Sequence, residues 1–75
     1  MSEPDRIDFK ELLRLLESEG KVSTYKVSLM MHRQFNTIKH WRRTGRLEHY
    51  DGVRLLMIFR EYCKDLTVPF TKDET

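Results

Sequence analysis

The stretch QFNTIKHWRRTGR, residues 34–46, places five cationic side chains, counting His40, around a single tryptophan and contains no acid. At 100° per residue around a helix, Ile38 and Trp41 fall on one face, so that the indole would anchor the helix to a core. The opposite face carries only hydrogen-bonding and cationic groups: Asn36, Lys39, His40 and Arg43. One side of this helix can therefore pack inward while the other is offered to a polar, negatively charged partner.

The major groove of duplex DNA suits such a face, because it admits one helix and each base pair presents a distinct pattern of donors and acceptors. Asn and Gln can bind adenine through two hydrogen bonds, which makes Asn36 the first candidate for reading a base and Gln34 the second. Phe35 either covers the core or touches a thymine methyl group. Three further side chains could reach bases or phosphates: Lys39, His40 and Arg43.

Other side chains of the same region are expected to contact phosphates, which position a protein on DNA without reading its sequence. They are Arg33, Thr37, Arg42 and Arg46. From residue 20 to residue 47 the chain has seven Lys or Arg and no acid, whereas the rest holds the other seven and all twelve acids. This uneven distribution indicates a polyanionic partner, although a solvated cationic face would have the same composition.

The elements that must position these side chains are helices, since glycine is scarce and both prolines lie near the ends of the chain. Asp8 is expected to cap a first helix and Glu11 to complete a capping box, with Ile7 stapled onto Leu12. Gly20 is expected to stop this helix in a left-handed conformation. Its apolar residues recur at helical spacing: Phe9, Leu12, Leu13 and Leu16.

Three more helices are predicted. Ser23 caps the second, which ends near His32, and a tight turn leads into a third over about residues 35–44 that Gly45 ends. The fourth spans about residues 48–65 and is apolar on more than one side, so it is expected to be buried on more than one face. Its second face meets either another subunit or the centre of the monomer.

The segment TVPFTKDET, within the tail at residues 66–75, favours an extended conformation, and Pro69 restricts it to an edge position. It is expected to be either a short dimer arm or a frayed tail. With 75 residues the chain is a single domain, residues 1–75. So small a domain gains stability from oligomerisation or from regular helix packing when it lacks disulfides and metals.

Several functional classes are disfavoured by composition. Cys63 is the only cysteine, which excludes a disulfide within the monomer and fits a reducing, cytosolic compartment. The three histidines and Cys63 lack the spacing of a zinc site, and no glycine-rich phosphate loop is present. Cys63 lies in an apolar stretch where a thiol is usually packing, so no enzymatic activity, cofactor or small-molecule substrate is expected. No apolar run approaches the length of a membrane span.

The stretch TYKVSLMMHRQFNTIKHWRRTGR resembles the helix-turn-helix of lambda-repressor-like proteins, in particular the small phage Cro-type repressors. The family pattern has a small residue in the first helix, matched by Ser28, and an apolar residue three positions later, matched by Met31. Its branched aliphatic residue in the recognition helix corresponds to Ile38, and the apolar or tryptophan residue after that corresponds to Trp41. The resemblance covers about residues 23–60.

The resemblance implies an all-α domain of four to five helices that binds a palindromic DNA operator as a homodimer and regulates transcription by occluding a promoter. It assigns DNA-facing positions to Gln34, Phe35, Asn36, Lys39, His40 and Arg43. It also implies a cytoplasmic location, in a bacterial host cell or with its nucleoid. The turn departs from the family, since His32 and Arg33 replace a glycine and an apolar residue. The alternative is a small helical module that binds and inhibits a host protein.

Overall fold

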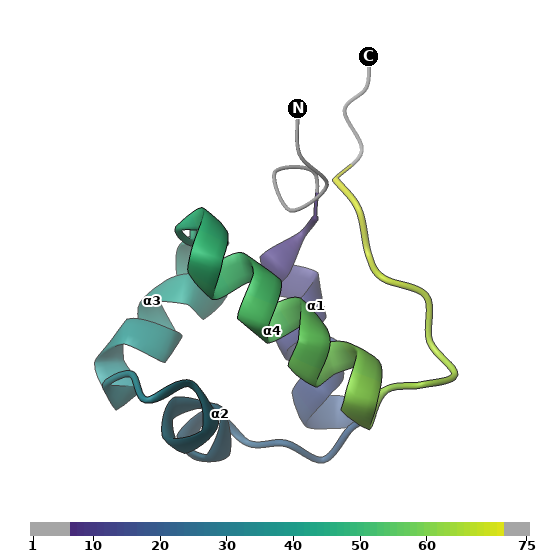
Figure 1. The fold of residues 1–75 in the computed structure, drawn as a ribbon, viewed down its shortest axis with the longest axis horizontal. Helices are drawn as coiled ribbons and strands as arrows, with labels where there is room; N and C mark the ends of the chain where they lie inside the picture. Colours follow the sequence, from purple (N-terminus) through teal and green to yellow (C-terminus); the bar gives the residue numbers. More distant parts are fainter. Residues whose placement is uncertain (1–6, 72–75) are drawn as a thin grey trace.

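The computed structural model describes residues 7–71, and within that range the chain is an all-α domain of four helices (Figure 1). The helices are α1 (Phe9–Ser18), α2 (Thr24–Met31), α3 (Phe35–Thr44) and α4 (His49–Tyr62). α1 and α2 both pack against α3, and α4 packs across α1 and α2. The predicted fold class, an all-α domain, is confirmed.

α1 begins as its sequence predicts, with one difference in the capping box. The Asp8 carboxylate accepts a hydrogen bond from the Glu11 N–H at 3.2 Å. The Glu11 side chain does not return to the Asp8 N–H, because it pairs with the Arg14 guanidinium, whose Nε lies 2.9 Å from Glu11 Oε1. The Asp8 N–H donates instead to the Pro69 carbonyl at 3.0 Å. The capping box is therefore only half formed, and the C-terminal segment supplies the missing acceptor.

The residue after α1 that takes the left-handed conformation is Lys21, with a φ of 59°, so the prediction for Gly20 was wrong. Gly20 is needed for a different reason, which is close packing. A Cβ atom at this position would lie 2.9 Å from the Leu16 carbonyl oxygen and 3.0 Å from the Cys63 sulfur. The absence of a side chain thus lets the α1–α2 connection pass against the end of α4.

Gly20→Ala is accordingly expected to destabilise the domain by about 1–3 kcal/mol, the usual cost of overpacking a well-filled site. Urea denaturation followed by circular dichroism measures the change. Ser18→Ala, at an exposed position two residues earlier, is the control and should change stability by no more than about 0.5 kcal/mol. An equal effect of the two substitutions would contradict the packing argument.

α4 is shorter than predicted: it ends at Tyr62 and not near residue 65. Cys63 leaves the helical region, with φ −127° and ψ 59°, and its side chain is buried. The chain then turns back along the domain, and Phe70 forms an antiparallel bridge with Ile7 (Figure 1). Up to residue 71 the tail is therefore neither frayed nor a free arm, since it pairs with its own chain; residues 72–75 lie outside the described part.

The core lies where the four helices meet, and its largest fully buried side chains come from all of them. They are Phe59, Leu12, Leu16, Met31, Ile38, Leu55, Val22 and Val27. The four apolar residues predicted for α1 are all buried, as are Ile38 and Trp41 of α3. Because α3 joins this core through one face only, its other face is open to solvent.

Candidate nucleic-acid interface

The connection between α2 and α3 is a tight turn built around a left-handed histidine. His32 has φ 58° and ψ 42°, a conformation that non-glycine residues adopt at a cost. The His32 N–H donates to the Leu29 carbonyl and the Arg33 N–H donates to the Ser28 carbonyl at 3.0 Å. These two bonds close the end of α2 in the way that glycine-terminated helices are closed. The turn is therefore formed without the expected glycine.

Arg33, the second unusual residue of the turn, is tied to α4 by an ion pair. Its Nη2 and Nε lie 2.7 and 3.2 Å from Asp51 Oδ1. The Asp51 side chain is only 8% exposed, whereas that of Arg33 is 42% exposed. The hydrogen bond and the charge of Asp51 raise the pKa of Arg33 above its ordinary value. This contact anchors the turn to the domain where an apolar side chain would otherwise pack.

α3 separates its two kinds of side chain as the sequence predicts. Ile38 is 0% exposed and Trp41 5% exposed, and both belong to the core. The polar residues of the opposite face are all exposed: Asn36, Lys39, His40 and Arg43. The helix is closed at its C-terminal end by Gly45, whose φ is 73° and whose N–H donates to the Trp41 carbonyl.

Two more of the base-reading candidates lie at the start of α3. Gln34 is the N-cap residue, and its exposed side chain makes no capping hydrogen bond, so its amide is left for other partners. Phe35 is 44% exposed, so it does not belong to the core, and its contact with a thymine methyl group stays a prediction. Lys39 Nζ lies 5.7 Å from the centre of that ring. The Phe35 ring and the Lys39 ammonium group thus lie close together on the exposed face.

At the other end of that face His40 and Arg43 lie one turn apart. Arg43 Nη2 is 3.2 Å from His40 Nδ1. This contact orients both side chains outward from α3, where each still has donors to spare.

The four residues assigned to phosphates are in different situations. Arg42 Nη1 lies 2.6 Å from Thr24 Oγ1 and 2.6 Å from Glu17 Oε1, so it joins α3 to the start of α2 and to α1. Arg33 is held by Asp51 as described. Arg46 is exposed and Thr37 half-buried. A phosphate role for Arg33 or Arg42 stays a prediction. Arg33 contacts Asp51 through Nε and Nη2, and Arg42 contacts Thr24 and Glu17 through Nη1, so each guanidinium keeps other N–H donors for a phosphate.

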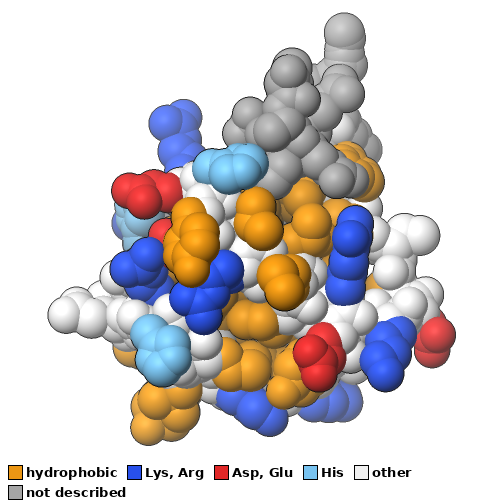
Figure 2. Space-filling model, in the orientation of Figure 1, with side chains coloured by type: hydrophobic (Ala, Val, Ile, Leu, Met, Phe, Trp, Pro, Cys, Tyr) orange, Lys and Arg blue, Asp and Glu red, His pale blue; other side chains and the backbone are white. Residues whose placement is uncertain are grey.

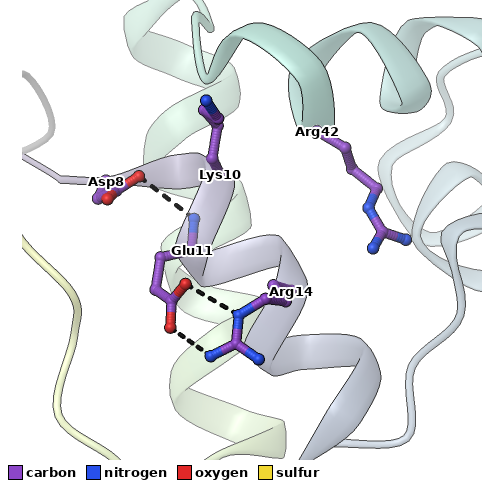
Figure 3. A pocket seen from close by; sticks show the side chains of 5 residues that line it. All are labelled: Asp8, Lys10, Glu11, Arg14 and Arg42. Carbon is purple, nitrogen blue, oxygen red and sulfur yellow. Dashed lines mark hydrogen bonds and ion pairs between the residues drawn. The ribbon is translucent and has the colours of Figure 1, made fainter.

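A shallow depression beside α1 is lined by acidic and basic side chains, but the acidic ones make hydrogen bonds within the helix itself (Figure 3). Asp8 caps α1, and Glu11 is engaged by Arg14, which lowers the pKa of Glu11. Arg42 stands across the depression on α3 (Figure 3). The two carboxylates are thus used for capping and surface pairing, which is not the arrangement of a general acid–base pair.

Elsewhere in residues 7–71 no three His, Cys, Asp or Glu side chains gather where they could hold a metal ion. The nucleophile considered in the sequence, Cys63, is buried, and its sulfur faces the Leu15 carbonyl at 3.9 Å. Burial, and after it the charge of Glu19, raises the pKa of the Cys63 thiol. Because the thiolate is the reactive form, a raised pKa lowers the reactivity at a given pH.

Cys63 in the folded protein is therefore expected to react with a disulfide reagent such as dithionitrobenzoate on the order of tenfold or more slowly than in the unfolded chain, because burial also limits access. The rate should rise with pH beyond the range in which an exposed thiol has already reached its plateau. Stopped-flow absorbance in buffer and in urea measures both. Equal rates in the two solvents would contradict the buried, protonated thiol.

Two acids outside the predicted site, Asp51 and Glu17, hold two of its candidate residues, Arg33 and Arg42. An acid within a largely apolar helix indicates a buried ion pair, and Asp51 is such a residue. Its partner is not readable from the sequence, because 18 residues separate Arg33 from Asp51. Two exposed apolar side chains of α2, Tyr25 and Leu29, also lie outside the predicted site.

Across the described helices, none combines the length and the apolar character needed to span a membrane. Comparisons with family models, with curated proteins and with solved structures give no match to this chain.

Proposed function

We propose that this chain is a sequence-preferring duplex-DNA-binding protein that regulates transcription as a dimer, with the exposed face of α3 in the major groove. One observation carries the proposal: Ile38 and Trp41 are buried, while Asn36, Lys39, His40 and Arg43 on the same helix are exposed. An amide, cationic groups and an imidazole are the side chains that bind base edges and phosphates in that groove.

The surroundings of α3 support the same function. No acid occurs from residue 20 to residue 47, and two acids outside this stretch are paired with its arginines, since Asp51 holds Arg33 and Glu17 holds Arg42. The pairs also fix the turn and the last turn of α3 to the rest of the domain. A rigidly held helix loses less conformational freedom when it binds, which favours affinity.

In the proposed mechanism the protein acts by occupying its DNA site. Two copies would present their α3 helices about 34 Å apart, one turn of DNA, on a palindromic site. Bound at a promoter, the dimer excludes the polymerase. The likeness to Cro-type repressors in the α2–α3 region agrees with this mechanism, and DNA as the ligand would place the protein with the chromosome in the cytoplasm.

The decisive experiment is selection of bound duplexes from a random pool, followed by a salt titration on the enriched sequence. We expect one palindromic sequence to be enriched and its binding to weaken steeply as the salt concentration rises. Binding releases cations from the DNA phosphates, and this release becomes less favourable when more salt is in solution. Absence of both enrichment and salt-dependent binding would overturn the proposal. A stoichiometric protein complex found instead would favour the alternative, a protein-binding module.

Arg46 provides the test for phosphate contacts, since it is exposed and makes no ion pair within residues 7–71. Arg46→Ala is expected to weaken binding to all duplexes by a similar factor and to reduce the slope of log K against log salt by about 1. Fluorescence anisotropy at several salt concentrations measures it. Arg60→Ala, an exposed arginine on α4, is the matched control and should leave the slope unchanged.

A further inference from the structure

α4 leaves an apolar stripe uncovered on the side away from the core. Met57 is 65% exposed and Tyr50 64% exposed, although both belong to a helix whose other side is fully buried. Figure 2 shows hydrophobic side chains running along the middle of the face on which α4 lies, with charged side chains beside them. A shallow groove on this face is lined by Met30, Arg54, Met57, Ile58 and Glu61.

The charges that border this groove have a particular symmetry. Arg54 and Glu61 are seven residues apart, which is two helical turns or about 10.5 Å along α4. Met57 and Ile58 lie midway between them. No ion pair joins Arg54 or Glu61 to another residue of the range 7–71. A positive group and a negative group thus stand at equal distances on either side of an apolar centre.

We infer that the occupant of this groove is a second copy of the chain, with the two α4 helices packed antiparallel about a two-fold axis that passes between Met57 and Ile58. In that arrangement Arg54 of each copy lies opposite Glu61 of the other, and Met57 lies against Ile58. A two-fold interface requires a patch that is complementary to itself, and this patch meets that condition in both charge and apolarity. The surface does not involve α3, so it can be tested without DNA.

Sedimentation equilibrium of the full chain without DNA tests the arrangement. The wild type is expected to dimerise. Arg54→Glu and Glu61→Arg should each raise the dissociation constant by about tenfold or more, since each brings like charges together at both ends of the interface. The double variant, Arg54→Glu with Glu61→Arg, should recover dimerisation, because it restores two opposite pairs in exchanged positions.

Arg43→Glu makes the same change of charge on α3 and is the control, expected to leave dimerisation unchanged. Circular dichroism of each variant establishes that it is folded. A wild type that stays monomeric up to about 1 mM would overturn the inference, as would single variants that dimerise normally or a double variant that fails to recover. Failure here leaves DNA binding untouched, because a monomer that still selects one duplex sequence retains the proposed use of α3.

Discussion

Trp41→Ala is expected to destabilise the domain by about 3–5 kcal/mol, the usual cost of removing a buried aromatic side chain. Trp41 is 5% exposed and anchors α3 to the core beside Ile38. A small domain has a total stability of about 5–15 kcal/mol, so this one change removes a large part of it. Chemical denaturation followed by circular dichroism measures the loss.

His40→Ala is the control for Trp41→Ala, because it truncates the preceding, exposed residue of the same helix and should cost no more than about 0.5 kcal/mol. Trp41 is also the only tryptophan, so its fluorescence in the wild-type protein reports directly on this site. The emission should be blue-shifted and protected from acrylamide until the protein unfolds. An exposed, readily quenched indole in the native state would show that α3 is not anchored as described.

Asn36→Ala is expected to have the second large effect, on recognition and not on stability. If the Asn36 amide reads a base, its loss should cost about 1–3 kcal/mol of affinity for the preferred duplex and relax the preference at one base pair. Because Asn36 is exposed, the free energy of unfolding should change little. Anisotropy titrations with the selected duplex and its three variants at each position measure the loss of affinity and the change of preference.

Arg46→Ala is the matched comparison for Asn36→Ala, since it should weaken every duplex alike. The two variants therefore distinguish reading of a base from contact with the backbone. If Asn36→Ala leaves the selectivity unchanged at every position, Asn36 does not read a base, and Gln34 becomes the first candidate. If both variants bind as the wild type does, α3 is not the contact surface.

Much of the fold was predictable because its signals are local. Ser23 and Gly45 mark the start of α2 and the end of α3 through hydrogen bonds to residues three or four positions away. The spacing of Ile38 and Trp41 predicts which side of α3 is buried, since a helix repeats every 3.6 residues. The exposed positions of the candidate site follow from the same periodicity, and the structure agrees with them.

Features that depend on distant parts of the chain could not be predicted. The sequence predicts a left-handed stop at Gly20, because the close approach of Cys63 to this position is invisible in the sequence. The capping box at Asp8 is predicted to close on itself, but the Pro69 carbonyl accepts the Asp8 N–H instead. The predicted end of α4 lies three residues beyond the observed one, since the burial of Cys63 depends on how α1 packs.

The all-α class, the approximate limits of the helices and the two faces of α3 follow from the sequence, because capping and helical periodicity act over a few residues. The packed domain is needed to show which arginines are already paired, that the tail returns to Ile7, and that Met57 stays uncovered. Each of these depends on groups brought together from separate helices, and the competition between such partners is resolved only when the whole domain packs.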